Sequence, residues 1–199
     1  MASLGYSQIP DEYGLKFGYV NSRQKWNYLI GGFSNIEDSV EPIDALKIGL
    51  YSGWKITSNL GFMLEIYFSQ KGSKMVLEGT DAMGQVAWTT DHLFSVDYVE
   101  TLALFTLNLK YKSVFLYFLV GPRIDYLYYG KAFDYSLQDG LNKVNLGYSL
   151  AVGIKTGLFI APVSIEIRHN PDKTFMHESK NLEIRNSTLD ILVGVSLKK

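Results

Sequence analysis

The chain has 199 residues, a formal net charge of −1 and no cysteine. This length suits a single domain, and the near-neutral charge argues against a nucleic-acid-binding protein, which would usually carry a basic excess. The absence of cysteine excludes a disulfide framework and thiolate chemistry. No run of apolar residues approaches the roughly 18 that a transmembrane helix needs, so a membrane signal must lie in a shorter pattern.

Alternation of apolar and polar residues predicts eight β-strands. Read in steps of two, each segment separates into an apolar face and a face of small, polar and charged residues, as in a pleated strand. In chain order, the predicted strands are 15–19, 46–56, 62–71, 104–111, 116–131, 145–155, 163–170 and 189–198.

Segment 145–155 indicates which face of a strand meets lipid and which face meets the interior of the barrel. Its large apolar residues are Leu146, Tyr148, Leu150, Val152 and Ile154, and its other face carries Gly147, Ala151 and Gly153. Glycine and alanine suit the crowded interior of a narrow barrel better than a solvated surface. The apolar face is therefore predicted to meet lipid.

The connections between these segments alternate long and short. The long ones run roughly over 21–44, 72–96, 131–143 and 171–187, and the short ones over 57–60, 112–113 and 156–160. This alternation is typical of an outer-membrane barrel with long external loops and short periplasmic turns. We therefore predict an all-β, eight-stranded antiparallel up-and-down transmembrane β-barrel over residues 13–199, after an N-terminal tail of residues 1–12.

Aromatic residues gather near the ends of the predicted strands. Trp54, Phe62 and Tyr111 lie near the short-turn end, and Tyr19, Phe68, Tyr126, Tyr128 and Tyr148 lie near the other. Such groups form the interfacial girdles of membrane barrels. The predicted location is the bacterial outer membrane. Because Met1-Ala2-Ser3 leads directly into polar residues, we interpret the sequence as a mature form whose export signal has been removed.

Charged residues on the inward faces form a predicted interior polar cluster. Its members are Glu65, Lys71, Lys110, Arg123, Asp125, Glu166, Arg168 and Asp190. An eight-stranded interior is just wide enough for side chains, and unpaired charges there would be costly. We expect a salt-bridged plug around Glu65, Arg123, Glu166 and Arg168, with Glu65 paired to Lys71, Lys110 or Arg123. An ion path or a catalytic carboxylate pair is the less favoured alternative.

Four runs resemble the PorT-like outer-membrane β-barrel family of Bacteroidetes-type bacteria. They are Glu65-Ile66-Tyr67-Phe68-Ser69-Gln70-Lys71-Gly72 for its third strand, 105–111 for its fourth, Leu119-Val120-Gly121-Pro122 with Tyr126 for its fifth, and Glu166-Ile167-Arg168-His169-Asn170 for its seventh. The resemblance spans roughly residues 13–199. It implies an integral outer-membrane protein, associated in some members with secretion machinery.

Motifs for catalysis and metal binding are weak. His92, His169 and His177 are scattered, and no two have metal-ligand spacing on one element. The pair Asp91-His92 could belong to the active site of a surface hydrolase or acyltransferase. A solvated loop explains these two residues more simply. We predict no catalytic, cofactor or metal site.

The external loops offer a better functional surface. Met75, Val76, Leu77, Val86 and Trp88 are apolar residues in one predicted long loop, and we choose them as the candidate partner loop. The predicted function is therefore structural, or a protein interaction through external loops, with the lipid bilayer and a protein as partners and no nucleic acid. The alternatives are a soluble lipocalin-like barrel that binds an apolar ligand, and an outer-membrane lipid-modifying or proteolytic enzyme. The pattern does not fix the partner's identity or the oligomeric state.

Overall fold

The computed structural model describes residues 9–28, 40–80, 86–112, 114–132, 135–136, 141–156, 161–178 and 182–197. These residues form an all-β structure. Its strands are β1 (Glu12–Tyr28), β2 (Val40–Lys55), β3 (Leu60–Thr80), β4 (Val86–Tyr111), β5 (Val114–Ala132), β6 (Tyr135–Ser136), β7 (Val144–Thr156), β8 (Val163–Pro171), β9 (His177–Glu178) and β10 (Leu182–Ser196). The described part of the chain contains no helix long and apolar enough to cross a membrane.

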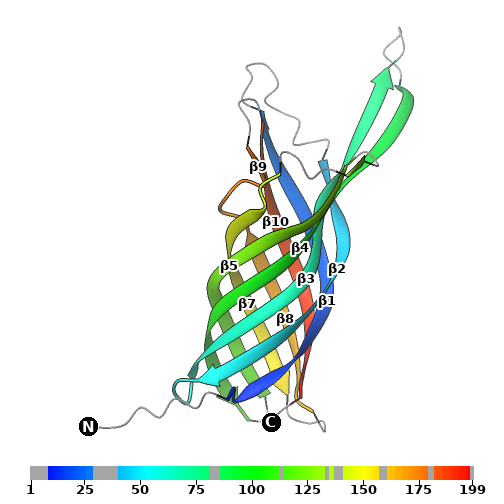
Figure 1. Ribbon diagram of the computed structural model, residues 1–199. Coiled ribbons are helices and arrows are strands. Elements are labelled where there is room, and N and C mark those ends of the chain that lie inside the picture. The colour runs from blue at the N-terminus through cyan, green and yellow to red at the C-terminus, as the bar shows by residue number, and fades with distance from the viewer. Residues whose placement is uncertain are drawn as a thin grey trace.

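The long strands close into a barrel (Figure 1). Neighbours follow the order β1-β2-β3-β4-β5-β7-β8-β10, and β10 pairs with β1 in antiparallel register from Gly14 opposite Ser196 to Tyr28 opposite Leu182. The two-residue strands β6 and β9 pair with β5 and β10. Within the described residues, the predicted eight-stranded antiparallel up-and-down barrel is confirmed, with these two short additions.

The short connections, the start of β1 and the end of β10 lie at one end of the barrel (Figure 1). Residues 56–59 join β2 to β3, and residues 112–113 join β4 to β5. Lys112 has a positive φ of 54°, the conformation that a two-residue hairpin turn requires. The amide of Leu197 donates to the carbonyl of Tyr13 at 2.8 Å, so β1 begins beside the end of β10.

The predicted long loop over 72–96 is wrong for most of its length. Strand β3 continues to Thr80 and β4 begins at Val86, and the two form a hairpin that projects beyond the barrel (Figure 1). The predicted long loop over 21–44 is also wrong at its start, because strand β1 continues to Tyr28. Alternation predicts a strand only where one face is buried, and a hairpin that stands clear of the barrel meets solvent on both faces.

The outer surface of the barrel is apolar, and its interior is mostly polar with smaller buried apolar clusters, one of which includes Leu102, Leu104 and Leu119. Leu46 is 80% exposed and Leu150 is 46% exposed, whereas Ser149 and Asn145 are fully buried. This polarity is the reverse of a soluble ligand-carrying barrel, so the lipocalin-like alternative is excluded. Inward glycines make room for large rings: a Cβ on Gly49 would lie 2.3 Å from Cδ1 of Tyr67.

Aromatic residues gather at both edges of the apolar belt. At the short-turn end the ring of Phe62 lies 6.2 Å from Trp54 and 5.9 Å from Phe105, centroid to centroid. At the other end the ring of Phe68 lies 6.1 Å from Tyr128. These contacts match the predicted interfacial girdles.

We predict that Leu150→Arg lowers the yield of folding into lipid vesicles. Leu150 lies midway along β7 on the outer face, where an arginine at the bilayer centre costs about 2–4 kcal/mol. Asn27→Arg, an exposed position above the belt, is the matched control and should fold like the parent. Equal folding of Leu150→Arg and the parent, measured by heat-modifiable migration, would contradict the outward assignment.

Candidate functional site

Four charged side chains form a closed ion-pair ring in the lower lumen. The Nζ atom of Lys16 on β1 lies 2.6 Å from Oε1 of Glu65 on β3 and 2.8 Å from Oε2 of Glu166 on β8. The guanidinium of Arg168 contacts the other oxygens of both carboxylates, each at 2.5 Å. All four side chains are buried, so each charge is compensated by two partners.

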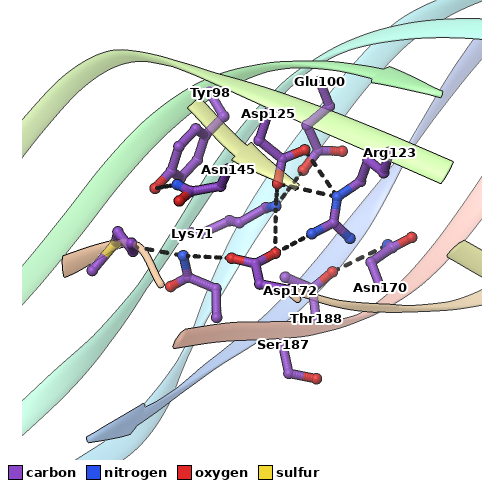
Figure 2. Close-up of polar contacts among 12 residues, drawn as sticks. Lys71, Tyr98, Glu100, Arg123, Asp125, Asn145, Asn170, Asp172, Ser187 and Thr188 are labelled. Carbon is purple, nitrogen blue, oxygen red and sulfur yellow. Dashed lines mark hydrogen bonds and ion pairs between the residues drawn. The ribbon is translucent and has the colours of Figure 1, made fainter. Parts of the chain in front are cut away.

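A second ion network fills the upper lumen (Figure 2). Lys71 binds Asp125 at 2.6 Å and Glu100 at 2.9 Å, and Arg123 binds Asp125 and Asp172. Glu100 also accepts from Lys47 at 2.5 Å. These side chains come from strands β2, β3, β4 and β5 and from the residue after β8, so the network joins opposite walls of the barrel.

Tyr67 separates the two networks and contacts both. Its ring centroid lies 4.8 Å from Nζ of Lys47 and 5.6 Å from Cζ of Arg168. Lys47 also binds Asp190 at 2.8 Å, and Asp190 accepts from Asn170 at 2.7 Å. Cation–π contacts and amide hydrogen bonds thus extend the ion pairs into one continuous polar core.

The structure places the predicted cluster residues in three locations. Glu65, Glu166 and Arg168 belong to the lower ring, and Lys71, Arg123, Asp125 and Asp190 belong to the upper network. The inclusion of Lys110 is wrong, because this side chain is exposed at the short-turn end with Nζ 5.7 Å from the ring centroid of Phe115. Alternation gives the face of a residue but not its depth in the barrel.

The predicted partners of Glu65 are also wrong. Its carboxylate binds Lys16 and Arg168 in place of Lys71, Lys110 or Arg123. Lys16 lies 49 residues earlier in the chain, on a strand that is not adjacent to β3 in the sheet. The stagger between neighbouring strands of the closed sheet determines which side chains lie at the same level across the lumen. The sequence of a single strand does not specify this stagger.

Two carboxylates of the upper network were missed. Glu100 falls on β4 before the predicted strand start at residue 104, and Asp172 falls in the predicted loop 171–187. The signal for Glu100 was present, since Val96, Tyr98 and Glu100 share the inward parity of Leu102. Asp172 continues the inward parity of Asn170 in the same way.

The lumen is closed on the external side by an apolar cluster. Phe94, Val96 and Tyr98 of β4 pack with Met176 and Ile184, and all five are buried. Below the ion networks, a cavity of about 360 Å³ opens at the short-turn end, lined among others by Tyr51, Met63 and Tyr117. In the part of the lumen that the structure describes, the cap and the ion pairs obstruct passage between the two ends.

The histidines lie on separate surfaces. His92 lies on the projecting hairpin, and His169 faces outward on β8 with Nε2 3.1 Å from Oγ of Ser187. The carboxylate of Asp91 binds Nζ of Lys74 at 2.6 Å, and this hydrogen bond raises the pKa of Lys74. Adjacent strand residues face opposite sides, so Asp91 points away from His92. Among the described residues, no three His, Asp or Glu side chains form a group that suits a metal ion.

The candidate partner loop lies on strands of the projecting hairpin. Met75 pairs with His92, Leu77 with Thr90, and Val76 with Asp91, while Val86 pairs with Thr80 after a register shift. Trp88 lies opposite Gly79, on the same face as Met75, and is 56% exposed.

Both outer edges of this hairpin extend beyond its neighbours. The pairing of β2 with β3 ends at Val40 opposite Met75, and the pairing of β4 with β5 ends at Phe94 opposite Ala132. Among the described strands, none pairs with the outer edge of residues 76–80 or 86–93.

We predict that Lys71→Met destabilises the barrel more than Asp172→Asn. Within the described residues, the two networks join five cations (Lys16, Lys47, Lys71, Arg123 and Arg168) and six carboxylates (Glu65, Glu100, Asp125, Glu166, Asp172 and Asp190). Removing a cation leaves buried carboxylates uncompensated, at a cost of about 3–5 kcal/mol. Removing one carboxylate leaves five charges of each sign.

The measurement is urea unfolding of both variants in the same lipid vesicles. Asp172→Asn retains the side-chain oxygen that accepts from Asn186, which makes it a conservative partner for the comparison. Equal losses in the two variants, or none for Lys71→Met, would show that the charge balance does not govern stability.

Comparison with known proteins identifies the fold. No family model matches the chain, and no curated protein matches it. Neisserial surface protein A is 9% identical with a TM-score of 0.50, over 92% of this chain and 96% of that one. The outer membrane protein OprG of Pseudomonas aeruginosa is 9% identical with a TM-score of 0.50, over 96% and 98%.

The outer membrane protease OmpT of Escherichia coli is 12% identical with a TM-score of 0.48, over 98% and 99% of the two chains. At such identities the likeness concerns the fold alone. By that fold, with its closed antiparallel sheet and apolar belt, the chain is an integral β-barrel of the kind found in the bacterial outer membrane.

Proposed function

We propose that the protein is an interaction protein of the outer membrane, and that the projecting β3–β4 hairpin is its contact surface for a protein partner. The observation that carries the proposal is the reach of this hairpin past the barrel wall, with long outer edges that no described strand covers. Hydrogen bonding to such an edge is a common mode of peptide recognition.

The composition of the hairpin supports the same role. Trp88 and Met75 place an aromatic and a flexible apolar side chain on one face, and tryptophan is among the residue types that dominate interface energies. The other face carries the Lys74–Asp91 ion pair. A charged face beside an open edge limits non-specific edge-to-edge association, which a protein with a specific partner needs.

The obstructed interior supports a role outside the lumen. Ion pairs and large rings fill the middle of the barrel, and the cap that includes Met176 covers its external side. We also propose that the protein is not an enzyme: Asp91 is bound by Lys74 and does not orient His92. Membership of the PorT-like family, with an association with secretion machinery, is part of this proposal and rests on the sequence resemblance.

The hairpin register defines a clean shortening experiment. Because Met75 and His92 lie directly opposite, residues 76–91 can be replaced by Asn-Gly, which forms a two-residue hairpin turn. We expect the shortened protein to retain the heat-modifiable migration of a folded barrel and to lose the partners captured by crosslinking in the native membrane.

Two point variants refine the test. Trp88→Ala should weaken partner capture without shortening the hairpin, and Tyr111→Ala, an exposed aromatic at the short-turn end, is the control that should leave it unchanged. A shortened barrel that keeps its full set of crosslinked partners would refute the role of the hairpin.

A further inference from the structure

A chain of hydrogen bonds runs from the apolar cap down to the upper ion network. The indole N–H of Trp26, which packs against the cap, donates to Oε1 of Gln24 at 3.1 Å. Nε2 of Gln24 donates to Oδ1 of Asn186 at 3.0 Å, and Nδ2 of Asn186 donates to Oδ2 of Asp172 at 3.2 Å. Gln24, Asn186 and Asp172 are buried, so two amides link the cap to a carboxylate out of reach of bulk water.

The two ends of this chain fix its direction. An indole nitrogen can only donate, and an ionised carboxylate can only accept. Each amide therefore turns its oxygen toward Trp26 and its NH2 group toward Asp172. The sulfur of Met176 agrees with this orientation, because it accepts from Nε2 of Gln24 at 3.7 Å and from Nδ2 of Asn186 at 3.5 Å. The polarity of the whole chain thus depends on the charge of Asp172.

The upper network carries an excess of negative charge. Among the described residues it joins three cations to four carboxylates. The cations are Lys47, Lys71 and Arg123, and the carboxylates are Glu100, Asp125, Asp172 and Asp190. An uncompensated charge in a buried site favours neutralisation by a proton.

Asp172 is the carboxylate of this network best placed to bind that proton. Nζ of Lys71 lies 3.9 Å from Oδ1 of Asp172, compared with 2.6 Å from Oδ2 of Asp125. Asp172 follows the end of β8, beyond the membrane-spanning part of the strand. Burial there raises the pKa of its carboxyl group.

The surroundings of Asp172 contain other titratable groups. Those of the network wall are Lys71 from β3, Tyr98 and Glu100 from β4, and Arg123 and Asp125 from β5 (Figure 2). Lys173 and Glu178 are exposed, and His177 of β9 pairs with Ile184 of the cap. Because histidine changes charge near neutral pH, His177 needs a separate control.

A proton on Asp172 conflicts with the direction of the chain. Oδ1 of Asp172 accepts from Arg123, so the proton must lie on Oδ2. The new O–H would point at the NH2 group of Asn186, which is also a donor. Turning the Asn186 amide removes this conflict but presents its NH2 group to Gln24, which must turn as well. The NH2 group of Gln24 then faces the indole N–H, and Trp26 loses the Gln24 oxygen.

We propose that Asp172, Asn186 and Gln24 form an acid-responsive relay that couples the charge of the upper network to the external cap. When the pH falls, Asp172 binds a proton, the two amides reverse, and the hydrogen bond from Trp26 to Gln24 breaks. The ring of Trp26 packs edge-on against Phe94 with centroids 6.3 Å apart, so the cap loosens at this aromatic contact.

The test is a pH titration of the full-length, 15N-labelled barrel in lipid nanodiscs, followed through its three indole N–H resonances. Loss of a hydrogen bond moves an indole proton upfield. We expect the Trp26 resonance, assigned with Trp26→Phe, to move upfield in one step between about pH 8 and about pH 5, above the ordinary range of aspartate. The resonances of Trp54 and Trp88 are internal controls and should not move.

Four variants locate the group that titrates. Asp172→Asn removes the titratable carboxyl, and Asn186→Ala interrupts the relay while leaving Asp172 in place. In both, the Trp26 resonance should not change with pH. Asp97→Asn is the matched control, since this carboxylate of β4 lies outside the network and accepts from Gln70. Asp97→Asn and His177→Gln should both titrate like the parent.

Three results would overturn the relay. The first is a Trp26 resonance of the parent that stays constant over this pH range. The second is a titration that persists in folded Asp172→Asn or, where that variant does not fold, in Asn186→Ala. The third is a titration that disappears in His177→Gln, which would assign the response to the histidine of the cap.

Discussion

The lack of hydrogen-bond partners in hydrocarbon is the constraint on which the structure depends. Each backbone amide and carbonyl at membrane depth must be paired within the sheet, which leaves closure as the solution for a β-structure. The pairing of β1 with β10 meets this requirement along fifteen residue pairs. Closure also fixes a narrow bore, and the bore then decides that glycines face large rings and that charges face one another.

The interior resolves a conflict between charge and desolvation. Lysines and arginines in a dry lumen are costly unless several partners share them, and most of the interior cations contact two or more carboxylates. Tyr67 lies between Lys47 and Arg168 and provides a π surface that both cations contact. A core built this way fills the middle of the barrel, and we propose that the protein meets its partner at an outer surface.

One surface of this kind is the projecting β3–β4 hairpin. It offers outer edges that none of the described strands pairs with, and an exposed Trp88, and both features suit a polypeptide.

The sequence by itself determined the strands that cross the membrane and the face that each presents. One side of these strands meets lipid and the other meets the lumen, so alternation records the choice in Leu150 and Ser149. Outside the membrane this signal is lost, and the hairpin over 72–96 was therefore mistaken for a loop.

Depth and cross-lumen contact were decided by the tertiary structure. Lys110 has inward parity yet lies exposed at the mouth, and Glu65 meets Lys16 and Arg168 instead of its predicted partners. The stagger of a closed sheet sets which residues share a level, and that quantity belongs to all the strands together and to none of them alone.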